Sequence, residues 1–290
     1  MLSVAFIGMG VMGAPMAGHL KNAGYAVTVY NRTHSKAVSW VEQYGGQHAP
    51  TPASAAQDKD VVITCVGNDD DLRDVLLGEQ GAVTAMQAGS LLIDHTTASA
   101  NIARELSETL KTCSIEFLDA PVSGGEAGAR NGQLTIMAGG ERSAFEKAAP
   151  IFDVYSKMAR LLGPAGSGQL CKMVNQICIG GLLQALSEAI NFADNAGLDL
   201  EAVMSVITKG AAQSWQMENR WQTMQQGSYE HGFAVDWMRK DFALVLDEAA
   251  RNGSTLPVTA LVDQFYADVQ SLGGGRWDTS SLLARIKKLK

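Results

Sequence analysis

The first 163 residues alternate short apolar runs rich in β-branched residues with segments of helical length. The runs include SVAFIG, AVTVYN, DVVITCVG and SLLIDHTT. Strands that alternate with helices in this way are typical of βαβ units, in which helices cover both faces of a mostly parallel sheet. Gly24 and Gly45 fall where two of the helices are expected to end. We therefore predict an α/β domain over residues 1–163.

The strand pattern stops at the stretch LLGPAGSG, and the rest of the chain is helical in pattern. It begins with a long apolar segment from about Gln169 to Asn195, which we expect to join an all-α domain, residues 164–290, to the first domain. A helix longer than about 25 residues exceeds what one small domain usually covers, so we expect a homodimer or homotetramer. The alternative is that the two domains of one chain bury this helix.

Composition and charge limit the classes of molecule that this chain is expected to bind. The chain has 290 residues, 46% of them hydrophobic, and a net charge of −7 without a basic stripe, which argues against nucleic acid. Its four cysteines form no CxxC pair and its five histidines lack metal-ligand spacing, so we predict no metal site. The N-terminus has no basic leader, and no apolar run reaches the roughly 18 residues of a membrane span. We expect a cytoplasmic protein with a small-molecule partner.

Residues 8–13, GMGVMG, match GxGxxG directly after a predicted strand and before a predicted helix. In that context Gly8 permits a tight turn, Gly10 lets the backbone approach a pyrophosphate, and Gly13 lets helix and strand pack closely. The loop also contains Met9, Val11 and Met12. The alternative is that the glycines only form a turn. We predict a Rossmann-type, doubly wound domain that binds a dinucleotide with its phosphates on the helix N-terminus.

The residues after the second strand bear on the choice between NAD and NADP. An NAD-specific domain carries Asp or Glu there to bind the ribose 2′-hydroxyl. This chain has Asn31, Arg32 and Thr33, with no acidic residue before Glu42. A guanidinium binds a 2′-phosphate through forked, charge-assisted hydrogen bonds. We predict NADP in preference to NAD, with a solvated surface arginine as the alternative.

Two further segments carry groups suited to an organic acid. Ser123, Gly124 and Gly125 end the fifth predicted strand, LDAPVSGG, where a hydroxyl and two glycine amides would cradle a carboxylate. Lys172 interrupts an otherwise uncharged helical run and shares one helix face with Asn175 and Gln176. Such a lysine either extends its ammonium to water or is held in a site, where loss of water favours proton transfer. For Ser123 to Gly125 the alternative is a serine-glycine turn that binds no ligand.

Four motifs in order make the chain similar to the β-hydroxyacid dehydrogenase family, which includes 3-hydroxyisobutyrate dehydrogenase and the tartronate, glyoxylate and succinic semialdehyde reductases. They are FIGMGVMGAPMAGHL, DAPVSGGEAGARNG, GSGQLCKMVNQ and RKDFALVLDEA. The resemblance spans the chain and implies NADP-dependent interconversion of a small hydroxyacid with its semialdehyde or keto acid.

The resemblance also implies roles for individual residues. Lys172 is the implied general acid/base, Asn175 and Gln176 orient the reacting oxygen, and Ser123 to Gly125 hold the substrate carboxylate. Further matching positions approach the cofactor or shape the active site: Thr96, Thr97 and Lys240 near the nicotinamide, Val66 and Asn68 elsewhere on the cofactor, and Phe233 and Asp241 near the substrate. The chain departs from many members at Gln176, where they have asparagine, and at CVGNDD, where they have Met-Leu-Pro.

Two rival functions remain: an imine reductase, which is an enzyme of related architecture, and a scaffold without turnover, which belongs to a different class. Imine reductases have a related architecture but usually lack the lysine and the serine-glycine segment. A scaffold that binds cofactor without turnover is expected where this lysine has been lost, whereas this chain retains Lys172. The 6-phosphogluconate dehydrogenases need a helical domain much longer than the roughly 125 residues left after the first domain.

Overall fold

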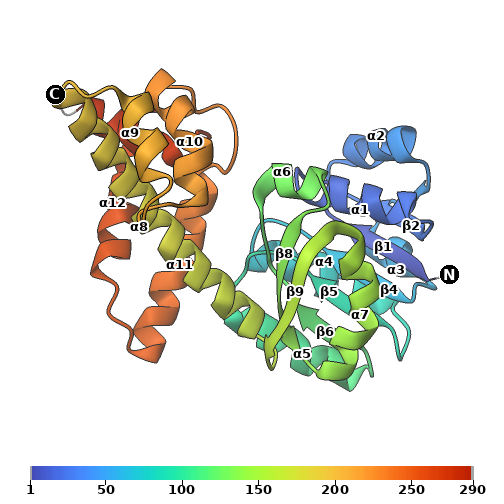
Figure 1. Ribbon diagram of the computed structural model, residues 1–290. Helices are drawn as coiled ribbons and strands as arrows, with labels where there is room; N and C mark the ends of the chain where they lie inside the picture. Colours follow the sequence, from blue (N-terminus) through green and yellow to red (C-terminus); the bar gives the residue numbers. More distant parts are fainter. Residues whose placement is uncertain (1, 289–290) are drawn as a thin grey trace. The chain divides into compact units, whose positions relative to one another are not determined.

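The computed structural model describes residues 2–288 and divides into two compact units, one ending at Lys172 and one beginning at Met173. The first unit contains the sheet, and helix α8 (Ser167–Asn195) runs from the first unit into the second. The predicted division between residues 163 and 164 falls at the end of the last strand. The α/β fold class, followed by a helical C-terminal region, is confirmed (Figure 1).

Within the described residues the first unit has one nine-stranded sheet in the order β3-β2-β1-β4-β5-β6-β8-β7, with β9 paired to β8. The strands are β1 (Ser3–Ile7), β2 (Ala26–Tyr30), β3 (Gln47–His48), β4 (Val61–Thr64), β5 (Leu91–Asp94), β6 (Glu116–Asp119), β7 (Val122–Ser123), β8 (Leu134–Gly140) and β9 (Ser156–Gly163). From β3 to β6 all neighbours are parallel, whereas β8 is antiparallel to β6 and β7. Chain order reverses at β1, between β2 and β4, which is where open sheets of this kind bind ligands.

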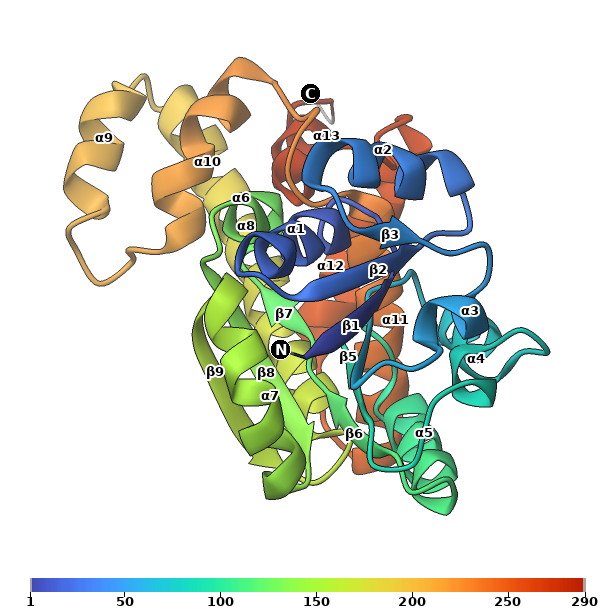
Figure 2. The same ribbon diagram turned by 90° about the vertical axis from the view of Figure 1, so that its right-hand side faces the viewer.

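Successive side chains of the strands point to opposite faces of the sheet and pack into two separate hydrophobic cores. Val4 and Phe6 of β1 face α1, α2, α6 and α7, whereas Ala5 and Ile7 face α3, α4 and α5, the layer that Figure 2 shows beside β1. The bounds of these helices are α1 (Gly13–Asn22), α2 (His34–Tyr44), α3 (Pro52–Ala56), α4 (Asp69–Leu77), α5 (Ala100–Thr112), α6 (Gly125–Arg130) and α7 (Arg142–Tyr155). The two faces explain why the strands read as continuous apolar runs.

Two helices that follow the strands are capped by polar side chains. The Asn68 side chain accepts a hydrogen bond from the Asp71 amide at the start of α4, and Ser99 accepts one from Ile102 at the start of α5. Three aspartates occupy the first turn of α4, where the helix dipole favours negative charge. The loops at the carboxyl edge of the sheet therefore begin well-defined helices.

The second unit is helical in its described part, apart from one isolated bridge between Ala234 and Asp278. Its elements after α8 are α9 (Leu200–Ile207), α10 (Trp215–Gln226), α11 (Val235–Asn252), α12 (Pro257–Ser271), a short 3-10 turn (Thr279–Ser281) and α13 (Leu282–Lys288). One core lies among α8, α9, α10 and α13, and a second lies among α8, α11 and α12. In residues 2–288 no helix is both long and apolar enough to cross a membrane.

Candidate functional site

The glycine-rich loop between β1 and α1 is held by backbone and side-chain hydrogen bonds. The amide of Gly8 donates to the Tyr30 carbonyl over 2.8 Å, and the amide of Met9 donates to Oδ1 of Asn31 over 2.9 Å. Nδ2 of Asn31 donates in turn to the carbonyl of Thr33. Asn31 therefore couples the loop to the segment after β2, which is a structural role that the sequence did not reveal.

The three glycines of the loop differ in what a side chain would meet. A Cβ at Gly8 would lie 2.2 Å from the Cys65 carbonyl oxygen, and Gly8 has φ of +109°. At Gly13 it would lie 1.9 Å from the Gly8 carbonyl oxygen. At Gly10, which is exposed, it would meet nothing within 4 Å. The fold thus requires glycine at positions 8 and 13, while Gly10 leaves an open stretch of backbone that fits a closely approaching pyrophosphate.

Beside this loop, Arg32 is exposed and forms an ion pair with Asp71 in the first turn of α4, with 2.9 Å between Nη1 and Oδ1. Thr33 precedes α2 and is exposed. Val66 and Asn68 lie in the segment between β4 and α4. The Val66 amide donates to Oγ1 of Thr96, which links this segment to the one after β5.

Lys172 lies in the first unit and is buried, with 8% of its surface exposed. Its Nζ donates a hydrogen bond of 2.9 Å to the carbonyl of Val122, the residue before Ser123. The structure therefore places the ammonium beside the serine-glycine segment instead of in open solvent. Gly124 and Gly125 have φ of +133° and +61°, which L side chains rarely adopt, so the segment depends on both glycines.

The run predicted as the fifth strand, which ends in the serine-glycine segment, forms two short strands in the structure. Strand β6 ends at Asp119, and Ser123 belongs to the short β7, which pairs antiparallel with β8. Pro121 interrupts the run because it has no amide hydrogen for a sheet ladder. Both β6 and β7 pair antiparallel with β8, Asp119 opposite Gly139 and Ser123 opposite Thr135, so β7 continues the line of β6 in the same direction. The Ser123 hydroxyl thus lies at the end of this interrupted strand.

Gln169, which sequence reasoning missed, connects the loop after β5 to the first turn of α8. Its Nε2 donates to the carbonyl of Thr96 over 2.7 Å, and its Oε1 accepts from the amide of Ala98 over 3.0 Å. Thr97 lies between these two contacts, and Gln169 lies three residues before Lys172. The spacing of Gln169 and Lys172, one helical turn apart, was the available sign of this role.

Two buried aspartates also support these loops. Asp119 accepts hydrogen bonds from the amides of Gly166 and Gln169 where α8 begins, and desolvation raises its pKa to about 6. Asp94 accepts from Oγ1 of Thr64 and from the amide of Thr96, and desolvation raises its pKa to about 7. Both follow directly from burial of a carboxyl group in a low-dielectric interior.

The raised pKa of Asp94 makes stability depend on pH. The pKa of Asp94 is about 7 in the folded protein and 3.8 in the unfolded chain, so the folded state holds this proton more tightly. The stability that comes from holding the proton is fully present below pH 3.8 and is lost as the pH rises through 7. An asparagine at this position would not titrate, so we expect the unfolding free energy of Asp94→Asn, taken relative to wild type, to be about 2 kcal/mol higher at pH 8 than at pH 5. Thermal unfolding across that range measures it, with exposed Asp153→Asn as control. A difference that does not change with pH contradicts the prediction.

In the second unit, four predicted residues form a connected polar group. Nε2 of Gln176 donates to Oδ2 of the buried Asp241 over 2.7 Å, and Nζ of Lys240 lies 3.0 Å from Oδ1 of the same carboxylate. Nδ2 of Asn175 donates to Oε1 of Gln176. The glutamine that departs from the family pattern is therefore the direct partner of Asp241.

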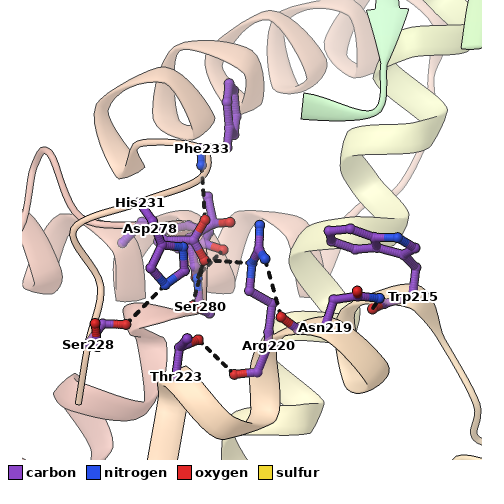
Figure 3. Close-up of polar contacts among 11 residues, drawn as sticks. Trp215, Asn219, Arg220, Thr223, Ser228, His231, Phe233, Asp278 and Ser280 are labelled. Carbon is purple, nitrogen blue, oxygen red and sulfur yellow. Dashed lines mark hydrogen bonds and ion pairs between the residues drawn. The ribbon is translucent and has the colours of Figure 1, made fainter. Parts of the chain in front are cut away.

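Phe233 lies on a loop that is fixed by the buried carboxylate of Asp278 (Figure 3). Oδ2 accepts from the amide of Phe233 over 2.9 Å, and Oδ1 accepts from the amide and hydroxyl of Ser280. Nε of Arg220 lies 3.3 Å from Oδ1 as an ion-pair contact, and its guanidinium also stacks on the Trp215 ring. Asp278 thus ties α10, the Phe233 loop and the segment before α13 together.

Because Asp278 serves three segments, we expect Asp278→Asn to destabilise the protein by about 2 kcal/mol through loss of charge-assisted hydrogen bonds. The thermal midpoint measures the effect. Asp268→Asn is the matched control, since Asp268 pairs with Arg285 but its side chain is 57% exposed. Equal midpoints for the two variants would refute the assignment of Asp278 as a connecting group.

No group of three or more His, Cys, Asp or Glu side chains in residues 2–288 is arranged to hold a metal ion. The described cysteines are all free thiols.

Comparison with known proteins gives matches over nearly the whole chain. Residues 3–178 match the NAD binding domain of 6-phosphogluconate dehydrogenase, and residues 166–286 match the model for NAD-binding of NADP-dependent 3-hydroxyisobutyrate dehydrogenase. An uncharacterized oxidoreductase of Shewanella frigidimarina is 64% identical over 99% of both chains. The 2-hydroxy-3-oxopropionate reductase of Escherichia coli is 32% identical over 99% of this chain and 97% of its own. The solved structure of Mycobacterium tuberculosis 3-hydroxyisobutyrate dehydrogenase with L-serine superposes with a TM-score of 0.88 at 27% identity, covering 99% of each chain.

Proposed function

As a member of the β-hydroxyacid dehydrogenase family, the chain is an NAD(P)-dependent oxidoreductase that acts on hydroxyl groups, and we propose that it interconverts a small hydroxyacid and its semialdehyde or keto acid with NADP(H). The observation that carries the proposal is the hydrogen bond from Lys172 to the Val122 carbonyl, because it puts a buried cation beside a serine-glycine segment suited to a carboxylate.

We assign the substrate carboxylate to the Ser123 hydroxyl and the amides of Gly124 and Gly125. With the acid held there, we propose that Lys172 gives a proton to the carbonyl oxygen of the reacting carbon as that carbon accepts the hydride, and takes the hydroxyl proton during oxidation. The Val122 carbonyl orients the ammonium for this exchange. A bound nicotinamide dinucleotide supplies or accepts the hydride.

Other residues position these groups. Gln169 holds the Thr96 to Ala98 loop in register with the helical turn that carries Lys172. We propose that Thr96 and Thr97 border the nicotinamide and that Val66 and Asn68 border the rest of the cofactor. We also propose roles in catalysis or in binding substrate and cofactor for five residues of the helical unit: Asn175, Gln176, Phe233, Lys240 and Asp241. Among them, Gln176 is held by its hydrogen bond to Asp241.

The preference for NADP is proposed from Arg32, an exposed guanidinium after β2 at the position where an NAD-specific domain has a carboxylate. We also propose a cytoplasmic homodimer or homotetramer, supported by the length of α8, which spans 29 residues. Light scattering on the purified protein measures its oligomeric state.

The function is tested by one panel of assays on the purified protein. NADPH and NADH oxidation is followed with glyoxylate, succinic semialdehyde and tartronate semialdehyde, and the reverse reaction with 3-hydroxyisobutyrate and L-serine. Turnover of at least one acid, faster with the NADP(H) pair, is expected. Turnover of a cyclic imine but no acid would favour an imine reductase, and cofactor binding without any turnover would favour a scaffold.

A further inference from the structure

We infer that Asp71 sets how strongly this enzyme discriminates between NADP and NAD, by competing with the 2′-phosphate for the guanidinium of Arg32. The inference rests on the proposed function, because it concerns the nucleotide site of the first unit. It predicts that the ratio of NADP affinity to NAD affinity is smaller than it would be if Arg32 had no carboxylate partner.

The position of the ion pair follows from the sheet order. Arg32 follows β2, and Asp71 lies in α4, which follows β4. Strands β2 and β4 are the two neighbours of β1, and the glycine-rich loop leaves β1 between them. The contact of 2.9 Å between Arg32 and Asp71 therefore joins the segments on either side of that loop, at the edge of the sheet where the nucleotide is proposed to bind.

The neighbouring aspartates of α4 have different partners. Asp69 accepts hydrogen bonds from the amide and hydroxyl of Ser99. Asp70 has a side chain that is 95% exposed and pairs with Arg73 at 3.5 Å. Asp71 is the carboxylate that contacts Arg32, and its own side chain is only 26% exposed. Asp70 is consequently a matched control, one residue away and without that contact.

The two cofactors meet this pair differently. A 2′-phosphate makes forked, charge-assisted hydrogen bonds with a guanidinium, but here it must displace the Asp71 carboxylate and approach its negative charge. A 2′-hydroxyl is neutral and faces neither cost. The Arg32 side chain is 78% exposed, so the existing pair is weak enough for a ligand to open. The aspartate thus reduces NADP affinity without abolishing it.

The test is calorimetric binding of 2′,5′-ADP and 5′-AMP to the full chain, which needs no turnover. We expect Asp71→Asn to tighten 2′,5′-ADP binding about 10-fold, since it removes both the competing partner and the repulsion, and to leave 5′-AMP within about twofold. Asp70→Asn should change either affinity by less than about twofold. In an Arg32→Gln background the gain from Asp71→Asn should shrink, because the shared guanidinium is gone.

The inference is overturned if Asp71→Asn and Asp70→Asn act equally, which would mean general electrostatics, or if 5′-AMP tightens as much as 2′,5′-ADP. Circular dichroism of Asp71→Asn confirms that the fold persists; the helix cap is retained because it uses the Asp71 amide and the Asn68 side chain. If wild type binds neither nucleotide, the proposed function fails as well. If both bind and selectivity is unchanged, only the role of Asp71 fails.

Discussion

Lys172→Ala is expected to lower kcat by about three orders of magnitude, the range that a general acid/base contributes, while the affinity for NADPH stays within about threefold of wild type. The reason is that the ammonium contacts the Val122 carbonyl beside the serine-glycine segment and is separate in sequence from the glycine-rich loop. Steady-state kinetics on the best acid from the panel and fluorescence titration with NADPH measure the two quantities.

Two further variants make this result interpretable. Lys172→Met keeps the aliphatic bulk of the buried side chain and should be as inactive as the alanine variant if proton transfer is what is lost. Lys157→Ala removes an exposed lysine of β9 and should leave kcat unchanged. An alanine variant at Lys172 that retains more than a few per cent of wild-type kcat would exclude this residue from the mechanism.

The second large effect is expected within the glycine-rich loop, where Gly8→Ala should destabilise the protein by at least about 3 kcal/mol. The added methyl would lie 2.2 Å from the Cys65 carbonyl oxygen, in a backbone conformation with φ of +109° that alanine rarely adopts. Thermal unfolding or loss of soluble protein measures this effect.

Gly10→Ala is the matched variant, two residues away. Its methyl meets nothing within 4 Å, so the thermal midpoint should stay near that of wild type while NADPH binding weakens by at least about 10-fold, since the added carbon occupies the surface that the pyrophosphate approaches. Undiminished NADPH affinity in this variant would contradict the nucleotide-binding role of the loop. A large stability loss would show that the glycine serves the fold.

Much of the fold was predictable because the responsible patterns are local. The continuous apolar runs correspond to β1, β2, β4 and β5, and the long segment predicted from Gln169 to Asn195 is α8, from Ser167. The short β3 and α6 were not anticipated, because two to six residues carry too little periodicity to register. Strand β7 lies within the run that predicted the fifth strand and continues β6 along β8 beyond Pro121.

The candidate site was predictable only in part. Motif spacing pointed to Gly8, Gly10 and Lys172 as chemically suited positions, and their roles remain proposals to be tested by the variants above. Sequence reasoning did not find Gln169 or Asp119, since a glutamine or aspartate beside a glycine-rich turn has many ordinary explanations. Their contacts with residues about 50 or more positions away revealed what they do.

The amino-acid sequence by itself determined the succession of strands and helices, the glycine-rich loop and the family, because apolar periodicity and glycine spacing act over a few residues. Only the tertiary structure decided which polar side chains meet: Arg32 with Asp71, Gln176 with Asp241, and Arg220 with Asp278. Each of these pairs joins residues that lie dozens of positions apart, and their contact depends on how strands and helices pack, which no local pattern encodes.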